Sequence, residues 1–107
     1  MIVTERLRRS GYEVEYVSDG NQAIDRVDAN AYDLMIFDIH MPGRMGYAVC
    51  EYAKKSAKNA NAPVILISAF PEEQTKWRQS YADAYLAKPF ETGRLNAEVE
   101  RLLKKTT

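Results

Sequence analysis

Three polar side chains follow apolar runs in this 107-residue chain, and their types could handle a phosphoryl group. Asp38 ends the run Leu-Met-Ile-Phe, Ser68 ends Val-Ile-Leu-Ile, and Lys88 directly follows Ala-Tyr-Leu-Ala. A carboxylate can act as a nucleophile that forms an acyl phosphate. A hydroxyl can donate a hydrogen bond to a phosphoryl oxygen, and an ammonium group can pair with the carboxylate or the phosphate. Each residue alone could be an ordinary cap, turn or surface residue, so the recurrence at successive strand ends is what indicates a site.

The apolar runs before these residues are predicted to be buried parallel strands. Residues 34–37 are apolar without a break, whereas a half-exposed strand would alternate, so this strand is expected to be covered on both faces. The same holds for Val64–Ile67, and Ala84–Ala87 is predicted to be a short last strand. In open α/β sheets ligands bind at the carboxyl ends of the strands, so we expect the three polar residues to lie together at that edge.

Helical spacing and turn residues predict the remaining elements. Residues 1–10 are predicted to form a short helix that Gly11 ends, and Tyr12–Val17 alternates like a strand. Further helices are predicted at 22–29, 46–58, about 71–79, and from 92 toward the C-terminus. This alternation predicts an α/β fold, a doubly wound parallel sheet with helices on both faces and right-handed crossovers.

Length and composition limit the functions to consider. Residues 1–107 are expected to form a single domain. The 15 basic and 15 acidic residues cancel and are interspersed, so we expect no nucleic-acid partner. No apolar run is long enough for a membrane span, so no membrane partner is expected either. The lone Cys50 excludes an internal disulfide, and a cytoplasmic location is the default expectation.

Three motifs around the polar residues resemble a known family. They are Asp38-Ile39-His40-Met41-Pro42-Gly43 with Gly46, Ile67-Ser68-Ala69, and Tyr85-Leu86-Ala87-Lys88-Pro89-Phe90. In their order and spacing, from residue 1 to the C-terminus, the chain resembles the receiver domain of bacterial two-component response regulators. The resemblance implies a flavodoxin-like sheet, a signalling role rather than an enzymatic one, and a histidine kinase or phosphotransfer protein as partner.

The resemblance also implies a role for each site residue. Asp38 would be the phosphoacceptor, Ser68 the hydroxyl that senses the phosphoryl group, and Lys88 the lysine that contacts it. Tyr85 matches the aromatic switch residue of the family, although a strand aromatic with a wet hydroxyl would look the same. The Lys88-Pro89 bond matches a bond that is cis in the family.

The chain departs from the family at its start. Receivers begin with an apolar strand that ends in an acidic pair, whereas this sequence starts inside the following helix, which implies an N-terminally truncated receiver with four strands instead of five. The family binds Mg²⁺ through the acidic pair, the phosphoacceptor and a backbone carbonyl that corresponds to His40. With only Asp38 and that carbonyl, we expect weak Mg²⁺ binding or none, and impaired phosphorylation. The missing strand would be central, so the chain must rejoin the two flanking strands directly, swap elements with a second copy or take a strand from a partner, and a homodimer is expected.

Two other functions compete with a working receiver. The first is a pseudo-receiver, a protein-interaction or dimerisation module that keeps the fold without phosphorylation. Met45 and Tyr81 stand where the family often has an acidic residue and a glycine. Both are expected on loops or helix ends near the surface used for partner contact, where they could add apolar interface or be chance surface residues. The second is a hydrolase with an aspartyl nucleophile, but the further acidic residue that such chemistry needs is missing after Asp38.

The imidazole of His40 has no second metal ligand nearby in sequence, so only the backbone carbonyl of His40 is expected to matter.

Overall fold

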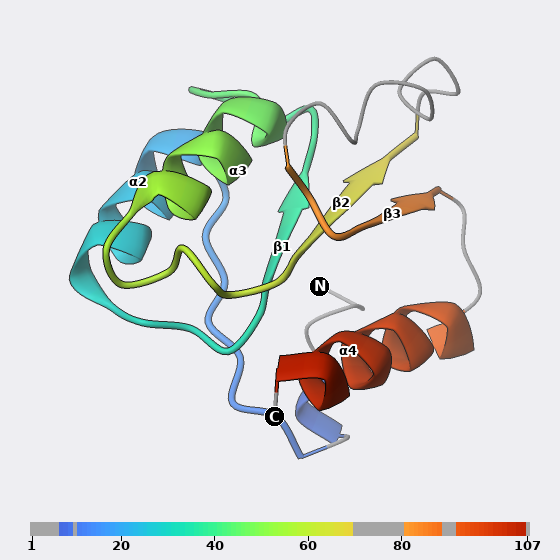
Figure 1. The fold of residues 1–107 in the computed structure, drawn as a ribbon. Coiled ribbons are helices and arrows are strands. Elements are labelled where there is room, and N and C mark those ends of the chain that lie inside the picture. Colours follow the sequence, from blue (N-terminus) through green and yellow to red (C-terminus); the bar gives the residue numbers. More distant parts are fainter. Residues whose placement is uncertain (1–6, 10, 70–80, 89–91, 107) are drawn as a thin grey trace.

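Three parallel strands form the sheet of the computed structural model, which describes residues 7–9, 11–69, 81–88 and 92–106 (Figure 1). They are β1 (Met35–Asp38), β2 (Val64–Ser68) and β3 (Ala84–Ala87), in the order β1-β2-β3. All five residues of β2 are buried, because β2 has a strand on each side and helices over both faces. The uninterrupted apolar runs thus predicted strands correctly at β1 and β2, although buried and half-buried residues alternate in β1. The α/β fold with a parallel sheet is confirmed.

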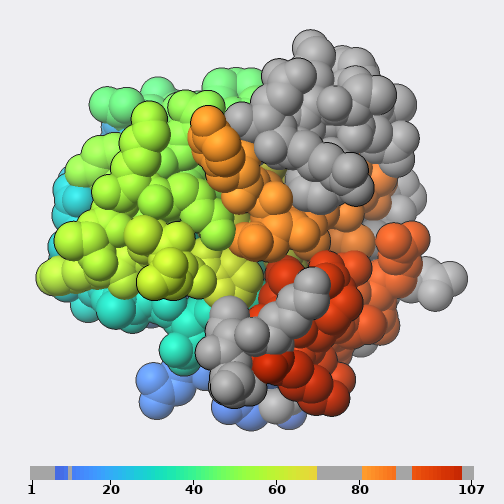
Figure 2. Space-filling model, viewed as in Figure 1, coloured from blue at the N-terminus to red at the C-terminus, as the bar shows by residue number. Residues whose placement is uncertain are grey.

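Helices cover both faces of this sheet. α2 (Gly20–Ala29) and α3 (Gly46–Lys55) lie on one face, and α4 (Thr92–Thr106) lies on the other (Figure 1). Residues 81–88, which include β3, come to the surface between the α3 region and α4 (Figure 2). The layers are therefore helix, sheet, helix, as the alternation of elements predicts.

The core is divided by the sheet into two clusters of buried side chains. One lies between the sheet and the α2–α3 layer and contains Val27, Phe37, Ile39, Val49 and Leu66 among others. The other lies on the α4 side and contains Leu7, Ile65, Leu86, Leu95, Val99 and Leu102 among others. Ile65 and Leu66 belong to different clusters because successive side chains of a strand point to opposite faces. Burying each such side chain stabilises the fold by roughly 1.5–3 kcal/mol.

Several element ends differ from the prediction. α2 begins at Gly20 because Asp19 caps it, and the Asp19 Oδ1 accepts a hydrogen bond from the Gln22 N–H at 2.8 Å. α3 ends at Lys55, three residues before the predicted end, and the chain turns through 57–61. Of the first predicted helix, residues 7–9 are helical. The helix predicted at 71–79 and the bond to Pro89 lie outside the described residues.

The strand predicted over Tyr12–Val17 is not formed, since these residues have no regular secondary structure. Their alternation reflects side-chain burial, because Tyr12 and Val14 pack against the α4-side cluster and Val17 against the other one. Side chains hold part of the backbone, as Arg8 Nη2 donates to the Val14 carbonyl at 2.9 Å. Alternation of apolar and polar residues predicts one buried face but not the neighbouring strand that would complete a ladder. The described sheet therefore has three strands.

Candidate functional site

Asp38 lies at the carboxyl edge of the sheet, as its position after the apolar run predicts. It is the last residue of β1, and its side chain is partly exposed, at 35%. The ladder continues one residue farther, because the Ile39 N–H donates to the Ile67 carbonyl at 2.8 Å. Ile39 is completely buried, which fixes the backbone next to the carboxylate. Asp38 thus has a rigid backbone and a side chain that solvent can reach.

Lys88 reaches across β2 to Asp38, although 50 residues separate the two in sequence. The Lys88 Nζ donates to the Asp38 Oδ2 at 2.5 Å. The backbone of Lys88 is anchored as well, because its N–H donates to the Ser68 carbonyl at 2.7 Å. The ion pair is partly exposed, with 41% of the lysine side chain accessible, so it contributes at most about 1 kcal/mol to stability. Its main effect is to place a positive charge on one oxygen of the carboxylate.

The second oxygen of Asp38 is held by the backbone of the following loop. The His40 N–H donates to the Asp38 Oδ1 at 3.1 Å, and His40 itself is exposed. Among the described residues, the carboxylate therefore accepts from an ammonium group on one oxygen and from an amide on the other. Two different donors on two oxygens fix the plane of the carboxylate.

Ser68 and Tyr85 occupy the two strands beyond Asp38. Ser68 ends β2, is completely buried, and pairs in register with Ala87, the residue before Lys88. Tyr85 lies two positions earlier on β3, opposite Leu66, and is half-buried against the α2–α3-side cluster. The structure thus brings Asp38, Lys88 and the His40 amide into contact and places Ser68 at the same edge. It places Tyr85 farther back along the sheet.

The metal ligands at this edge are few. Asp38 is the one carboxylate in the segments 38–46, 67–69 and 85–88 that form the edge. Among the described residues no group of three His, Cys, Asp or Glu side chains could hold a metal ion together. Lys88 and the His40 amide already engage both oxygens of Asp38. These residues do not fit a Mg²⁺ site that depends on several protein carboxylates.

The sequence did not predict how the loop after Asp38 is anchored. This loop contacts the first turn of α2, where Arg44 Nε donates to the Asn21 Oδ1 at 3.0 Å. Two glycines in this region, Gly20 and Gly46, were the available signal, because each is packed too closely for a side chain.

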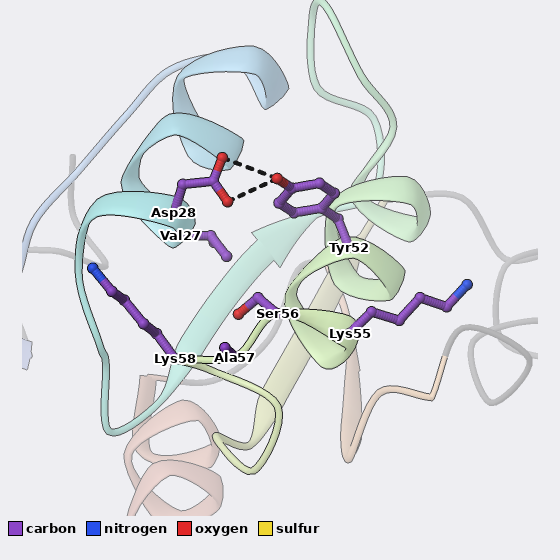
Figure 3. Close-up of a pocket in the computed structure, with 7 residues that line it drawn as sticks. All are labelled: Val27, Asp28, Tyr52, Lys55, Ser56, Ala57 and Lys58. Carbon is purple, nitrogen blue, oxygen red and sulfur yellow. Dashed lines mark hydrogen bonds between the residues drawn. The ribbon is translucent and has the colours of Figure 1, made fainter.

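A shallow pocket of about 430 Å³ lies away from these residues, between the ends of α2 and α3. In Figure 3 the Tyr52 hydroxyl donates to both oxygens of Asp28, while Lys55 and Lys58 point away from one another. Gly46, at the first residue of α3, packs against Asp38, so the pocket at the last turn of this helix belongs to the opposite edge of the sheet. No residue of the predicted site lines it.

No helix within the described ranges has the length and apolar character needed to cross a membrane.

Comparisons with known proteins agree on one family. The family model described as "Response regulator receiver domain" matches residues 1–100. An uncharacterized transcriptional regulatory protein of Bacillus subtilis, YrkP, is 34% identical over 108 residues, which cover 99% of this chain. The chain spans 45% of the length of that relative.

Solved structures give the same result. The receiver domain of a sensor histidine kinase from Pseudomonas aeruginosa, with magnesium coordinated in its active site cleft, has a TM-score of 0.88 and 27% identity, covering 96% of this chain and 86% of that one. The response regulator TrrA of Thermotoga maritima, in complex with Mg²⁺-BeF, has a TM-score of 0.84 and 32% identity, covering 94% and 86%. A Francisella response regulator receiver domain has a TM-score of 0.88 and 30% identity, covering 99% and 88%.

Proposed function

The chain belongs to the response regulator receiver domain family of two-component signalling, and from that membership we propose that Asp38 is its phosphoacceptor. The observation that carries the proposal is the contact between Lys88 and Asp38, which joins the ends of two strands across a third. A carboxylate oxygen of Asp38 would attack the phosphorus of a phosphohistidine. The new P–O bond forms as the P–N bond breaks, and the leaving imidazole keeps the electron pair and takes a proton from solvent. The donor is a histidine kinase or a phosphotransfer protein.

The neighbouring residues have supporting roles in this proposal. Lys88 leaves Asp38 Oδ2 in part to pair with the phosphoryl oxygens, since an ammonium group attracts the larger negative charge of the acyl phosphate. Ser68 ends β2, the strand between Asp38 and Lys88, and its hydroxyl donates a hydrogen bond to a phosphoryl oxygen. Tyr85 acts as a switch that responds when Ser68 moves toward the phosphoryl group, because Tyr85 lies on the adjoining strand, three residues before Lys88.

The small number of carboxylates leads to a second part of the proposal. The relatives from Pseudomonas aeruginosa and Thermotoga maritima hold magnesium, but in the described segments 38–46, 67–69 and 85–88 of this chain Asp38 is the one carboxylate, beside the His40 carbonyl. We therefore propose that this chain binds Mg²⁺ weakly and that Asp38 is phosphorylated slowly. Lys88 remains as a protein cation to offset the charge of the incoming phosphoryl group.

The test is intact-mass measurement after incubation with acetyl phosphate, with and without Mg²⁺. A slow gain of one phosphate, lost in Asp38→Asn and only slightly increased by Mg²⁺, is the expected result. Asp33→Asn is the matched control, because Asp33 is an exposed aspartate just before β1 and should keep the gain. A fast gain that depends fully on Mg²⁺ would contradict the impairment. No gain of phosphate in a folded protein would contradict phosphorylation of Asp38 and favour a role as an interaction module.

A second candidate function is a pseudo-receiver that acts as an interaction or dimerisation module. It is favoured by the sheet, because among the described residues β1 has a neighbouring strand on the β2 side only. Unpaired backbone groups at a sheet edge can pair with a strand of another chain, including a second copy. Sedimentation analysis tests this. A homodimer at micromolar concentration supports the module, whereas a monomer at all accessible concentrations is evidence against self-association.

A further inference from the structure

The loop of residues 39–45, here called the acceptor loop, is fastened to the start of α2. It connects Asp38 at the end of β1 with α3 and passes over the beginning of α2 (Figure 1). The Gly20 N–H donates to the Pro42 carbonyl at 2.9 Å. One residue later, the Asn21 Oδ1 accepts from the Arg44 Nε at 3.0 Å. A backbone bond and a side-chain bond thus join the same two segments.

Close packing shows that the contact tolerates no added atoms. A Cβ at Gly20 would lie 2.5 Å from the Arg44 carbonyl oxygen, and a Cβ at Gly46 would lie 2.5 Å from the Asp38 carbonyl oxygen. Gly43 has a φ of +84°, and a Cβ there would lie 2.9 Å from the Asn21 Nδ2. Contacts this short between a Cβ and backbone require the backbone to move. The acceptor loop can therefore occupy its position only if the α2 start has no side chain at residue 20.

The helix start that receives the loop is itself fixed. Asp19 caps α2 through the Gln22 N–H, so the backbone N–H of Gly20 is directed by a defined helix terminus. At the other end of the loop, the His40 N–H donates to the Asp38 Oδ1. Between them, the Gly46 N–H donates to the Ile39 carbonyl at 2.8 Å and closes the loop. Bonds thus connect the start of α2 with the carboxylate through a short, closed loop.

We propose that Gly20 and Asn21 are positioning residues for Asp38, acting through the acceptor loop and the His40 amide. Neither touches Asp38. They hold Pro42 and Arg44, which sets where the His40 N–H lies and therefore which way the Asp38 carboxylate faces. The role of this positioning in signalling rests on the proposed function of Asp38 as the phosphoacceptor. The positioning itself concerns the carboxylate in the unmodified protein and can be tested without phosphorylation.

The test uses the His40 amide proton in NMR spectra of the 107-residue protein. The shift difference between the parent and Asp38→Ala, which removes the acceptor, measures the bond from this amide to the carboxylate. Gly20→Ala should reduce that difference by at least about half, since the loop must move away. Gly93→Ala is the matched control. Gly93 also lies in the first turn of a helix, but a Cβ there meets nothing within 4 Å, so the His40 signal should not change.

Asn21 provides a variant that leaves the packing intact. Asn21→Ala removes the acceptor for Arg44 and should also reduce the His40 shift difference, whereas Asn21→Asp keeps an acceptor and should restore it. A purely structural role would lower stability in Asn21→Ala without changing the His40 signal, and that result would overturn the proposal. An unchanged signal in a folded Gly20→Ala would overturn it as well.

The phosphodonor experiment is independent of this test. If the parent protein takes up no phosphate but its His40 amide depends on Gly20 and Asn21, the proposed function is wrong and the positioning is right. If it takes up phosphate and the His40 amide is insensitive to both residues, the reverse holds.

Discussion

Tyr81 is held in a conformation that its side chain disfavours. It is the non-glycine residue with a positive φ among the described residues, at 69°, and 65% of it is exposed. The left-handed region costs a residue with a Cβ roughly 1–2 kcal/mol. Substitution by glycine removes this strain, but glycine is also more flexible in the unfolded chain, so only part of that free energy is gained. We predict that Tyr81→Gly raises the free energy of unfolding by about 0.5–1 kcal/mol, measured by urea denaturation.

The control for this prediction is Tyr81→Ala, which removes the exposed ring but keeps the Cβ. It should give no stabilisation. If alanine and glycine stabilise equally, the ring and not the backbone is responsible, and Tyr81 is better explained as an exposed apolar residue at an interface.

The individual site residues show what a sequence can predict. Asp38, Ser68 and Lys88 were placed at one edge because strand ends follow from apolar runs, and the structure brings them together. The donor on the second oxygen of Asp38 is a backbone amide, and its position depends on how a loop folds. Glycines at 20 and 46 indicate close packing but not the segment they pack against, so the Gly20 and Asn21 anchors were missed.

Asn59 connects elements that residue patterns treat as separate. It lies in the turn after α3 and is 1% exposed. Its Nδ2 donates to the carbonyls of Val27 and Asn30 at 2.9 and 2.8 Å, and its Oδ1 accepts from the Tyr32 N–H at 2.8 Å. Leaving these backbone groups without a partner costs about 1–3 kcal/mol each where they stay dry. We predict that Asn59→Ala lowers the free energy of unfolding by about 3 kcal/mol in thermal or urea denaturation.

Asn61→Ala is the matched control, because Asn61 is exposed in the same turn. It should change stability by less than about 0.5 kcal/mol. Equal effects at the two positions would mean that the turn itself, and not the bonds of Asn59, stabilises the packing of α2 on α3.

Two tyrosines give the packing of α2 and its neighbours a dependence on high pH. Burial and then the hydrogen bond to Glu15 raise the pKa of Tyr32 above 10.0. The hydrogen bond to Asp28, followed by burial, raises the pKa of Tyr52. A raised pKa means that the folded state keeps the proton longer than the unfolded chain. The stability from these groups is thus fully present below the unfolded value and is lost as the pH rises through the folded one.

We predict that the urea midpoint falls between pH of about 9 and about 11, and that Tyr32→Phe falls less steeply than the parent. Phenylalanine has no proton to lose, so it removes this part of the dependence. A parallel decline in parent and variant would show that another group governs the alkaline limb.

At the level of elements, apolar runs were more informative than alternation. The runs before Asp38 and Ser68 identified β1 and β2, because a strand packed between two helical layers has apolar residues on both faces, fully buried in β2 and alternately half-buried in β1. The alternating segment 12–17 has the same number of residues as an ordinary strand, yet it forms none. A strand exists only where a second strand accepts its backbone groups, and that partner is a property of the whole sheet.

In the described sheet, β1 is paired on one side only, and the directions of its N–H groups make this difference measurable. In a parallel ladder, alternate residues of a strand direct their N–H groups to opposite sides. The Met35 and Ile39 N–H groups donate toward β2, to the Pro63 and Ile67 carbonyls, so that of Phe37 points the same way. The N–H groups of Ile36 and Asp38 then face the side of β1 where, among the described residues, no strand is paired.

We predict that in dilute protein the amides of Ile36 and Asp38 exchange with solvent at least about tenfold faster than those of Phe37 and Ile39, measured by NMR hydrogen exchange. If a second copy adds a strand to this edge, raising the protein concentration should selectively slow the amide exchange of Ile36 and Asp38, because of these four amides only theirs face the added strand. Phe37 and Ile39 are the internal control, since their bonds to β2 exist at every concentration. Equal protection of all four amides in the dilute monomer would mean that the chain covers this edge by itself, and the argument for strand addition would then be lost.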